Sequence, residues 1–299
     1  MTRVLCIVGP TASGKSALAV DIARRLTPVG EIISTDSMQI YQGMDIGTAT
    51  PTAVERRGIP HHLLDRVSTD TVVTVADYQQ WARLAIDDVA SRGATPIVVG
   101  GSGLYVRAVL DDLQFPGTDP QVRARLEEEL EQHGAAIMHV RLAQVDPAAA
   151  LAIPATNGRR IVRALEVVEI TGNPFTATLP KGGSIYDVTF VGLAVPRDHM
   201  DSRISNRVEQ MWQAGFVDEV RSLGALGQTA RRALGYQQIS EALDGRCTLD
   251  EAKLATVEAT RRFARRQQRW FQPDQRITWL AYNADDLTDQ VLAVWGTST

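Results

Sequence analysis

The sequence has few cysteines, no long apolar run and no strong excess of either charge. Its two cysteines, Cys6 and Cys247, lack the paired spacing of a metal site, which argues against a disulfide framework or a cysteine–zinc centre and predicts two free thiols. No window reaches the roughly 20 apolar residues of a membrane-spanning helix, and the N-terminal apolar run is too short for a signal peptide. We therefore expect a protein of the cytoplasm without a membrane partner.

The overall charge does not point to a nucleic-acid partner. The 299 residues include 31 basic and 35 acidic side chains, for a formal net charge of −4. Binding to RNA or DNA would therefore depend on local clusters of basic residues. Apolar residues make up 44% of the chain and charged residues 22%, which is ordinary for a globular protein of one large or two smaller domains.

Short apolar runs alternate with helical spacing in the first third of the chain. Residues 3–8 and 95–103 read as buried strands, and residues 31–37 as a strand that ends in polar side chains. Between these runs, residues 16–26 and 77–93 have the spacing of apolar residues that is typical of helices. Such strand–helix alternation predicts an α/β fold with a parallel sheet.

The pattern becomes helical throughout from about residue 118 to residue 175. A loop rich in Gly and Pro follows at 178–184, and a further strand is predicted at 187–196. A helical insertion therefore interrupts the core domain. The predicted parts are a P-loop core over 1–117, a helical insertion over 118–186, and a second part of the core over 187–299.

Residues 9–16, GPTASGKS, match the phosphate-binding pattern GxxxxGK[ST]. The motif lies between an apolar run and a helical segment, which is the context that it requires. Its glycines let backbone N–H groups turn towards an anion, and the helix start adds partial positive charge. Lys15 would neutralise phosphate oxygens and the Ser16 hydroxyl would bind Mg²⁺. The motif predicts a diphosphate site without fixing the reaction.

The sequence lacks the strand ending in Asp that usually accompanies this motif in ATPases and GTPases. The best such strand, at 95–99, runs into Gly-Gly-Ser. An acid does follow the second predicted strand, at Asp36, and the carboxyl ends of parallel strands face the ligand crevice. Asp36 could position magnesium or a phosphoacceptor in a kinase, act as a general base for another nucleophile, or cap a turn.

Several segments together resemble the bacterial tRNA dimethylallyltransferase family, also called tRNA isopentenylpyrophosphate transferases. The resemblance covers nearly the whole chain, and the order of the segments makes it specific. They are GPTASGKS (9–16), STDSMQIYQGMDIGTATP (34–51), GIPHHLLD (58–65), VVGGSGLY (98–105), RRIVRALEV (159–167), ALGYQQ (233–238) and the arginine-rich segment 261–269.

The resemblance implies a P-loop core with a helical insertion and a prenyl transfer to tRNA. The family moves a dimethylallyl group from its diphosphate to N6 of the adenosine 3′ to the anticodon, with Mg²⁺ and with release of pyrophosphate. It implies that Asp36 is the general base, that Lys15 and Arg207 stabilise the leaving group, and that Ser16 binds magnesium. The implied diphosphate-binding residues are Gly9, Pro10, Thr11, Ala12, Ser13, Gly14, Lys15 and Ser16.

The resemblance also implies a set of tRNA contacts and a monomeric enzyme. Three of the implied contacts depart from the common family pattern: Arg159 stands where Gln is frequent, Gln237 replaces a basic residue, and Ser102 replaces Thr but keeps the hydroxyl. The segment 154–157 also departs, because it reads Pro-Ala-Thr-Asn where His-Pro-Asn-Asp is frequent. The implied tRNA-binding residues are Asp36, Ser37, Met38, Gln39, Ser102, Arg123, Arg159, Arg160, Arg163, Arg232 and Gln237.

Local charge is concentrated in the segment 261–276, which holds six arginines and one acid. Arginines four residues apart repel one another on a helix. Either RNA phosphates or acids from neighbouring helices would offset this repulsion. The aromatic residues Trp270, Phe271 and Trp279 are predicted to belong to the core.

Two other classes of function use the same motif. A kinase would bind ATP in the loop and use Asp36 to activate the phosphoacceptor, but the strand ending in Asp is missing. A P-loop RNA-binding protein without activity would have no need of Lys15, Ser16 and Asp36 together. The pair His61-His62 suggests a metal site, but adjacent residues lack a shared face and a third ligand, so hydrogen-bonding or packing roles are expected.

Overall fold

The computed structural model describes residues 1–175 and 183–297, which form two compact units. The first unit combines Met1–Asp111 with Ser184–Thr299, and the second is Asp112–Gly183. The sequence placed the insertion at 118–186, a few residues later at each end. The Gly/Pro-rich loop expected at 178–184 lies largely outside the described residues.

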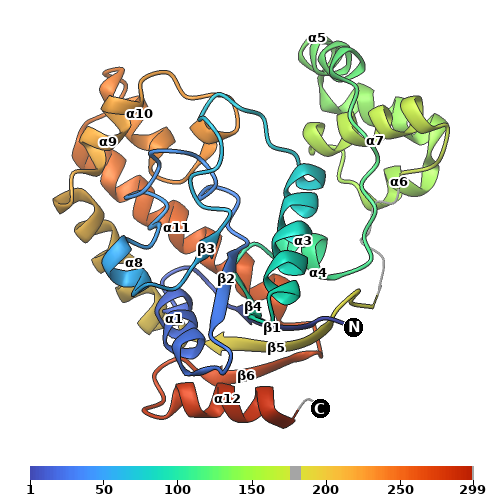
Figure 1. Cartoon of the computed structure of the whole chain (residues 1–299). Coiled ribbons are helices and arrows are strands. Elements are labelled where there is room, and N and C mark those ends of the chain that lie inside the picture. The colour runs from blue at the N-terminus through green and yellow to red at the C-terminus, as the bar shows by residue number, and fades with distance from the viewer. Residues whose placement is uncertain (176–182, 298–299) are drawn as a thin grey trace. The chain divides into compact units, whose positions relative to one another are not determined.

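The first unit is built on a six-stranded sheet in which every pair of neighbours is parallel. This confirms the α/β fold with a parallel sheet. The strand order is β3-β2-β4-β1-β5-β6 (Figure 1). The strands are β1 (Arg3–Val8), β2 (Gly30–Ser34), β3 (His61–His62), β4 (Thr95–Gly100), β5 (Asp187–Ala194) and β6 (Ile277–Ala281).

Successive side chains of a strand point to opposite faces of the sheet, so each central strand contributes to two separate hydrophobic cores. In β1, Val4, Cys6 and Val8 pack on one face of the sheet, and Leu5 and Ile7 pack on the other. The two faces are covered by different helices. The Leu5 face packs against α1 (Lys15–Arg25) and α12 (Leu287–Thr297), and the Val4 face against α3 (Val75–Ser91), α4 (Gly103–Leu110), α9 (Phe216–Leu223), α10 (Tyr236–Leu243) and α11 (Leu249–Phe271).

The three central strands end level with one another. Val8 at the end of β1 lies opposite Gly100 of β4, and Val99 lies opposite Ser34 of β2. The segments that follow these strands therefore begin at one edge of the sheet, where open α/β sheets bind ligands.

The remaining elements of the first unit are short or lie beside α11. They are α2 (Ala53–Arg56), α8 (Arg197–Gln213) and a 3₁₀ turn over Ala230–Arg232.

The aromatic residues near the end of α11 only partly belong to the core. Phe271 is buried and Trp279 packs against the core, as predicted, but Trp270 is 45% exposed. The core prediction is therefore wrong for Trp270, because Phe271 is the residue that the helix turns inward.

In its described residues, the second unit has three helices around a core that includes Leu126, Leu142 and Ile161. Asp119 caps the first helix by accepting the N–H groups of Gln121 and Val122. The helices are α5 (Pro120–Val145), which bends at Gly134 with φ +79°, α6 (Pro147–Ala152) and α7 (Gly158–Thr171). In neither unit does a helix of the described residues have the length and apolar character needed to cross a membrane.

Candidate active site

The phosphate-binding loop joins β1 to α1 at the edge where the strands end. Gly14, at the N-cap of α1, has φ +96°, and Ala12 has φ +61°. Gly14 is suited to this left-handed conformation, whereas a non-glycine residue such as Ala12 pays a strain for it. The loop therefore turns sharply at the start of a helix, which is a geometry that presents backbone N–H groups to an anion.

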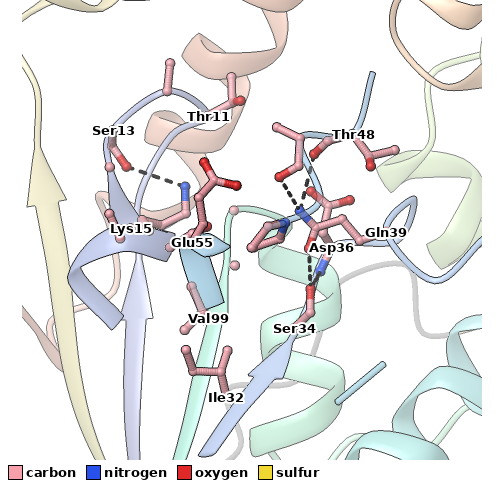
Figure 2. A pocket seen from close by; sticks show the side chains of 18 of the residues that line it. Thr11, Ser13, Lys15, Ile32, Ser34, Asp36, Gln39, Thr48, Glu55 and Val99 are labelled. Atoms are coloured by element: carbon pink, nitrogen blue, oxygen red, sulfur yellow. Dashed lines mark hydrogen bonds between the residues drawn. The ribbon is translucent and has the colours of Figure 1, made fainter. Parts of the chain in front are cut away.

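Lys15 folds back over its own loop. Its Nζ donates to the carbonyl of Pro10 at 2.6 Å and to the Ser13 hydroxyl at 3.4 Å (Figure 2). Burial and the nearby Arg207 lower the pKa of Lys15 to about 7, although Asp36 opposes them. An anion in the loop would favour the protonated ammonium again.

Asp36 lies two residues beyond the end of β2 and is held by the backbone. Its carboxylate accepts the N–H of Met38 at 2.9 Å, and its own N–H donates to the Ser34 hydroxyl at 3.2 Å (Figure 2). Tyr78 donates its hydroxyl to the Ser34 carbonyl at 2.8 Å, which fixes the strand end. Burial raises the pKa of Asp36, while the Met38 N–H, Lys15 and Arg207 lower it. Such a carboxylate can take up a proton more readily than an exposed one.

Helix α8 contributes two arginines one turn apart. Burial lowers the pKa of Arg207, and Asp36 raises it. Arg203 donates its Nε to the Ala12 carbonyl at 2.6 Å and lies over the Tyr282 ring. Sequence reasoning identified Arg207 but missed Arg203, although the i,i+4 spacing within the segment RISNR was a usable signal.

Lys15, Asp36 and Arg207 line one cavity of about 340 Å³, whereas Arg203 is not part of its lining. Its polar part includes residues 11–16 of the loop and Arg207, but not the predicted Gly9 and Pro10. Asp36 and Gln39 add polar groups, and Ile32 and Val99 on neighbouring strands form an apolar part (Figure 2). The volume falls within the range of small-ligand sites. The cavity therefore suits a ligand with an anionic head and a small apolar group.

The cavity contains a second carboxylate that is already committed. Glu55 of α2 lines it, but Oε2 accepts both the N–H and the hydroxyl of Thr52 in a capping box. Asp36 is therefore the better placed acid for proton transfer.

The residues present are compatible with magnesium held partly by a bound diphosphate. Ser16 is exposed and lines the cavity, and the Asp36 carboxylate is another oxygen group in the lining. No group of three or more His, Cys, Asp or Glu residues in the described parts of the chain could hold a metal by itself. Magnesium usually keeps several waters and binds through one or two protein groups plus substrate phosphates.

The end of β4 carries glycines because other side chains occupy the space. A Cβ on Gly100 would lie 1.9 Å from Thr35 Oγ1, and one on Gly103 would lie 1.8 Å from Trp270. A Cβ on Gly101 would lie 2.3 Å from Gln267 Nε2. Thr35 thus leaves no room for a side chain at position 100, and the close packing of α11 leaves none at positions 101 and 103.

The predicted tRNA-binding residues of the first unit do not all adjoin the cavity. Asp36 and Gln39 line it. Ser102 is the N-cap of α4 and is half-buried. Arg232 and Gln237 are exposed near the start of α10, outside the cavity lining. Ser37 and Met38 share the backbone segment of Asp36 and are partly buried.

The arginines of the second unit fall into two groups. Arg123 and Arg163 form ion pairs with Glu166, whose side chain is fully buried. Arg159 and Arg160 are exposed on the first turn of α7. The first pair therefore contributes to the packing of this unit, in addition to any contact with RNA.

The arginines of α11 also separate into two faces. Arg261 and Arg265 each lie 3.8 Å from Asp201 of α8, whereas Arg262, Arg266 and Arg269 are exposed. One acid of a neighbouring helix therefore lies near two of these five arginines, and Glu258 of α11 itself lies 3.5 Å from Arg262.

The two histidines form separate contacts. His61 Nδ1 lies 2.8 Å from the Ile59 carbonyl, and His62 Nε2 lies 2.8 Å from Glu31. Both cysteines are free thiols, as expected.

Fold and site together define an α/β protein with a phosphate-binding-loop geometry beside a half-buried carboxylate. A family model described as IPP transferase matches residues 39–274. The chain is 59% identical to a tRNA dimethylallyltransferase of Thermobifida fusca (strain YX), over 98% of this chain and 94% of that protein. It is 58% identical to a tRNA dimethylallyltransferase of Streptomyces avermitilis, over 96% and 93%.

Solved structures give the same result. The tRNA isopentenylpyrophosphate transferase of Bacillus halodurans has a TM-score of 0.73 and 37% identity, covering 100% of this chain and 98% of its own. A eukaryotic dimethylallyltransferase acting on tRNA has a TM-score of 0.81 and 25% identity, covering 98% and 78%. The chain belongs to the IPP transferase family.

Proposed function

We propose that this enzyme transfers a dimethylallyl group from dimethylallyl diphosphate to N6 of the adenosine 3′ to the tRNA anticodon. The single observation that carries the proposal is the joint position of Lys15, Asp36 and Arg207 around one cavity that also has apolar walls. The cations suit a diphosphate, the apolar walls suit a five-carbon group, and the carboxylate suits an amine. Relatives named tRNA dimethylallyltransferase support the same activity.

Asp36 is the proposed general base. The exocyclic amine of adenine is a weak nucleophile because its lone pair is delocalised into the ring, so proton removal by a placed base assists it. The N6 lone pair attacks the allylic carbon, the carbon–oxygen bond to the diphosphate breaks, and Asp36 accepts the N6 proton. Its raised pKa, caused by burial, suits this step.

Lys15 and Arg207 are the proposed groups that stabilise the leaving pyrophosphate. Negative charge grows on the diphosphate as the carbon–oxygen bond breaks, and fixed cations in a buried site stabilise that charge strongly. Backbone N–H groups of the loop would add to this effect. Ser16 is the proposed protein ligand of Mg²⁺, which would supply further neutralisation of the diphosphate. The proposed diphosphate site is therefore the loop from Gly9 to Ser16.

The adenosine has to leave the stacked anticodon loop to reach the half-buried Asp36. Unstacking costs a few kcal/mol and is easiest for a base in a single-stranded loop. Residues beside Asp36 would bind the extruded nucleotide, and exposed arginines would bind phosphates. The proposed tRNA contacts are Ser37, Met38, Gln39, Ser102, Arg123, Arg159, Arg160, Arg163, Arg232 and Gln237.

The proposed substrate also suggests where the protein acts and in which state. Because unmodified tRNA is a cytoplasmic substrate, we propose that the protein acts in the cytoplasm. The resemblance to the family also leads us to propose a monomeric enzyme. Sedimentation of the protein with and without tRNA would test this state.

The test incubates the protein with unmodified tRNA, Mg²⁺ and radiolabelled dimethylallyl diphosphate in the absence of ATP. We expect label in the RNA and one pyrophosphate released for each group transferred. A matched tRNA with guanosine in place of the adenosine 3′ to the anticodon should take up no label. Absence of label in the first tRNA, together with phosphate transfer to a small molecule in a separate incubation with ATP, would favour the kinase instead.

A further inference from the structure

Gln267 is a buried polar residue of α11 that contacts the phosphate-binding loop from across the chain. Its side chain is 7% exposed, and its Oε1 accepts the N–H of Thr11 at 2.8 Å. The two residues are separated by 256 positions. This hydrogen bond holds the backbone of the loop at Thr11, because it satisfies an N–H group that the loop itself leaves unpaired.

The other end of the same amide points elsewhere. Since only the oxygen can accept the Thr11 N–H, the orientation of the amide group is set and Nε2 lies next to Gly101. Nε2 makes no hydrogen bond within the described residues. Thr11, Gly101 and Gln267 all line the cavity that contains Lys15. Nε2 is not among the fully enclosed side-chain atoms that lack a partner, so it can be reached from the cavity, where an acceptor can bind.

The charges already present explain why a neutral donor fits here. Lys15 already lies among other basic residues: burial and then Arg207 lower its pKa to about 7, and Arg57 also lines the cavity. A further cation would increase that repulsion. The amide of Gln267 can donate to an anionic oxygen without adding charge.

We infer that Gln267 is a substrate-contacting residue whose Nε2 donates to the diphosphate while its Oε1 positions Thr11. The inference rests on the proposed function, because it takes the anion in the loop to be the prenyl diphosphate. Gly101 is glycine for the same reason, since any larger residue would displace the amide. Sequence reasoning missed Gln267 because it lies within the arginine-rich segment, although Phe263, Gln267 and Phe271 recur at helical spacing.

The test measures binding of inorganic pyrophosphate with Mg²⁺ to the full chain by calorimetry. Gln267→Met removes both the acceptor and the donor, and should weaken binding about tenfold or more, as for one charge-assisted hydrogen bond. Gln267→Glu keeps the acceptor for Thr11 but places a carboxylate where the donor was, and should weaken binding further. Gln268→Met is the matched control: Gln268 donates to the Val195 carbonyl at 3.1 Å and does not line the cavity, so its variant should bind within about twofold of wild type.

The order of the two variants separates contact from support. If Gln267→Glu binds pyrophosphate as wild type does, then Gln267 only supports Thr11 and the inference is wrong. If both Gln267 variants bind as wild type does, it is wrong as well. A measurement on the wild-type chain covers the case in which the variants do not fold: the side-chain amide resonances of Gln267 should shift on addition of pyrophosphate and those of Gln268 should not. Unshifted Gln267 resonances in a chain that binds pyrophosphate would overturn the contact.

The result can be told apart from failure of the proposed function. The binding assay contains neither tRNA nor a prenyl group, so a wild-type chain that binds pyrophosphate but labels no tRNA counts against the proposed function only. An active wild-type enzyme whose Gln267 variants bind pyrophosphate normally counts against the role of Gln267 only.

Discussion

The strand β2 has an acid near each end, and the two acids have opposite properties. Glu31, its second residue, accepts two hydrogen bonds from Arg92, at 2.5 and 2.9 Å, and one from His62. Arg92, opposed by burial and helped by His62, lowers the pKa of Glu31 to about 2. Asp36, just past the other end, has no ion-pair partner within 4.0 Å in the described part of the chain, and burial raises its pKa.

The difference lies in what surrounds each carboxylate. The guanidinium of Arg92 donates to both oxygens of Glu31, so the charge of Glu31 is neutralised within the fold. Asp36 is held by backbone N–H groups and only influenced by Lys15 and Arg207 from a distance. Perturbed pKa values caused by burial among nearby charges are typical of functional sites. The contrast marks Glu31 as structural and Asp36 as available to a substrate.

The largest expected effect comes from removing the carboxylate at the functional end. Asp36→Asn should lower the rate of transfer by about 10²–10⁴-fold, the usual loss for a general base. Affinity for tRNA should stay close to wild type, because the amide keeps the size of the side chain. Single-turnover transfer and filter binding would measure the two quantities. Transfer at the wild-type rate would remove Asp36 from the base role.

The next effect concerns the cation that faces this carboxylate. Lys15→Met should lower kcat/KM for dimethylallyl diphosphate by about 10²–10³-fold, because it removes charge stabilisation from the leaving group. The affinity for tRNA in the absence of the prenyl donor should change little. Steady-state kinetics with varied donor would measure the loss. An unchanged kcat/KM would show that Lys15 does not contact the diphosphate.

A smaller effect should appear as a proton taken up during binding. In the free enzyme the pKa of Lys15 is lowered to about 7, so at about pH 8 most molecules have a neutral Lys15. A bound diphosphate favours the ammonium and raises that pKa again, so binding should draw in close to one proton and weaken as the pH rises above about 7.

Calorimetry of pyrophosphate binding in buffers of different ionisation enthalpy would count the proton. Lys15→Arg is the control, because arginine stays protonated and only the titration of pyrophosphate itself remains. Equal proton uptake by the wild type and by this variant would contradict the lowered pKa.

The smallest effect is expected at the structural end of β2. Glu31→Gln should leave transfer unchanged and lower the free energy of unfolding by about 1–2 kcal/mol near pH 7, because one oxygen still accepts from Arg92. Since folding lowers the pKa of Glu31 from its usual 4.5 to about 2, the stabilisation is complete above about pH 5 and is lost as the pH falls towards 2. Urea unfolding at several pH values should show the two proteins converging at low pH. A loss of transfer in this variant would show that Glu31 is not purely structural, which would contradict the difference proposed between Glu31 and Asp36.

Features that depend on local sequence could be predicted from the residues alone. The loop from Gly9 to Ser16 follows from a pattern and its two neighbours, and the α/β fold with a parallel sheet follows from alternating apolar runs. The position of Asp36 beside the loop follows from the rule on strand ends. Its role in proton transfer stays a prediction.

Features that depend on distant contacts could not be predicted. Nothing near Gly101 or Thr11 in the sequence indicates that Gln267 lies against both. The ion pairs of Arg123 and Arg163 with Glu166 likewise need the packing of two helices. Helical spacing alone also could not decide which arginines of α11 lie near Asp201.

The central claim is that the loop holds a prenyl diphosphate instead of a nucleoside triphosphate. Calorimetry with Mg²⁺ can compare ATP with an unreactive dimethylallyl analogue whose bridging oxygen is replaced by sulfur. The account predicts that the analogue binds at least about tenfold more tightly than ATP, because the apolar walls add to the diphosphate contacts. Tighter binding of ATP, accompanied by its hydrolysis, would contradict it.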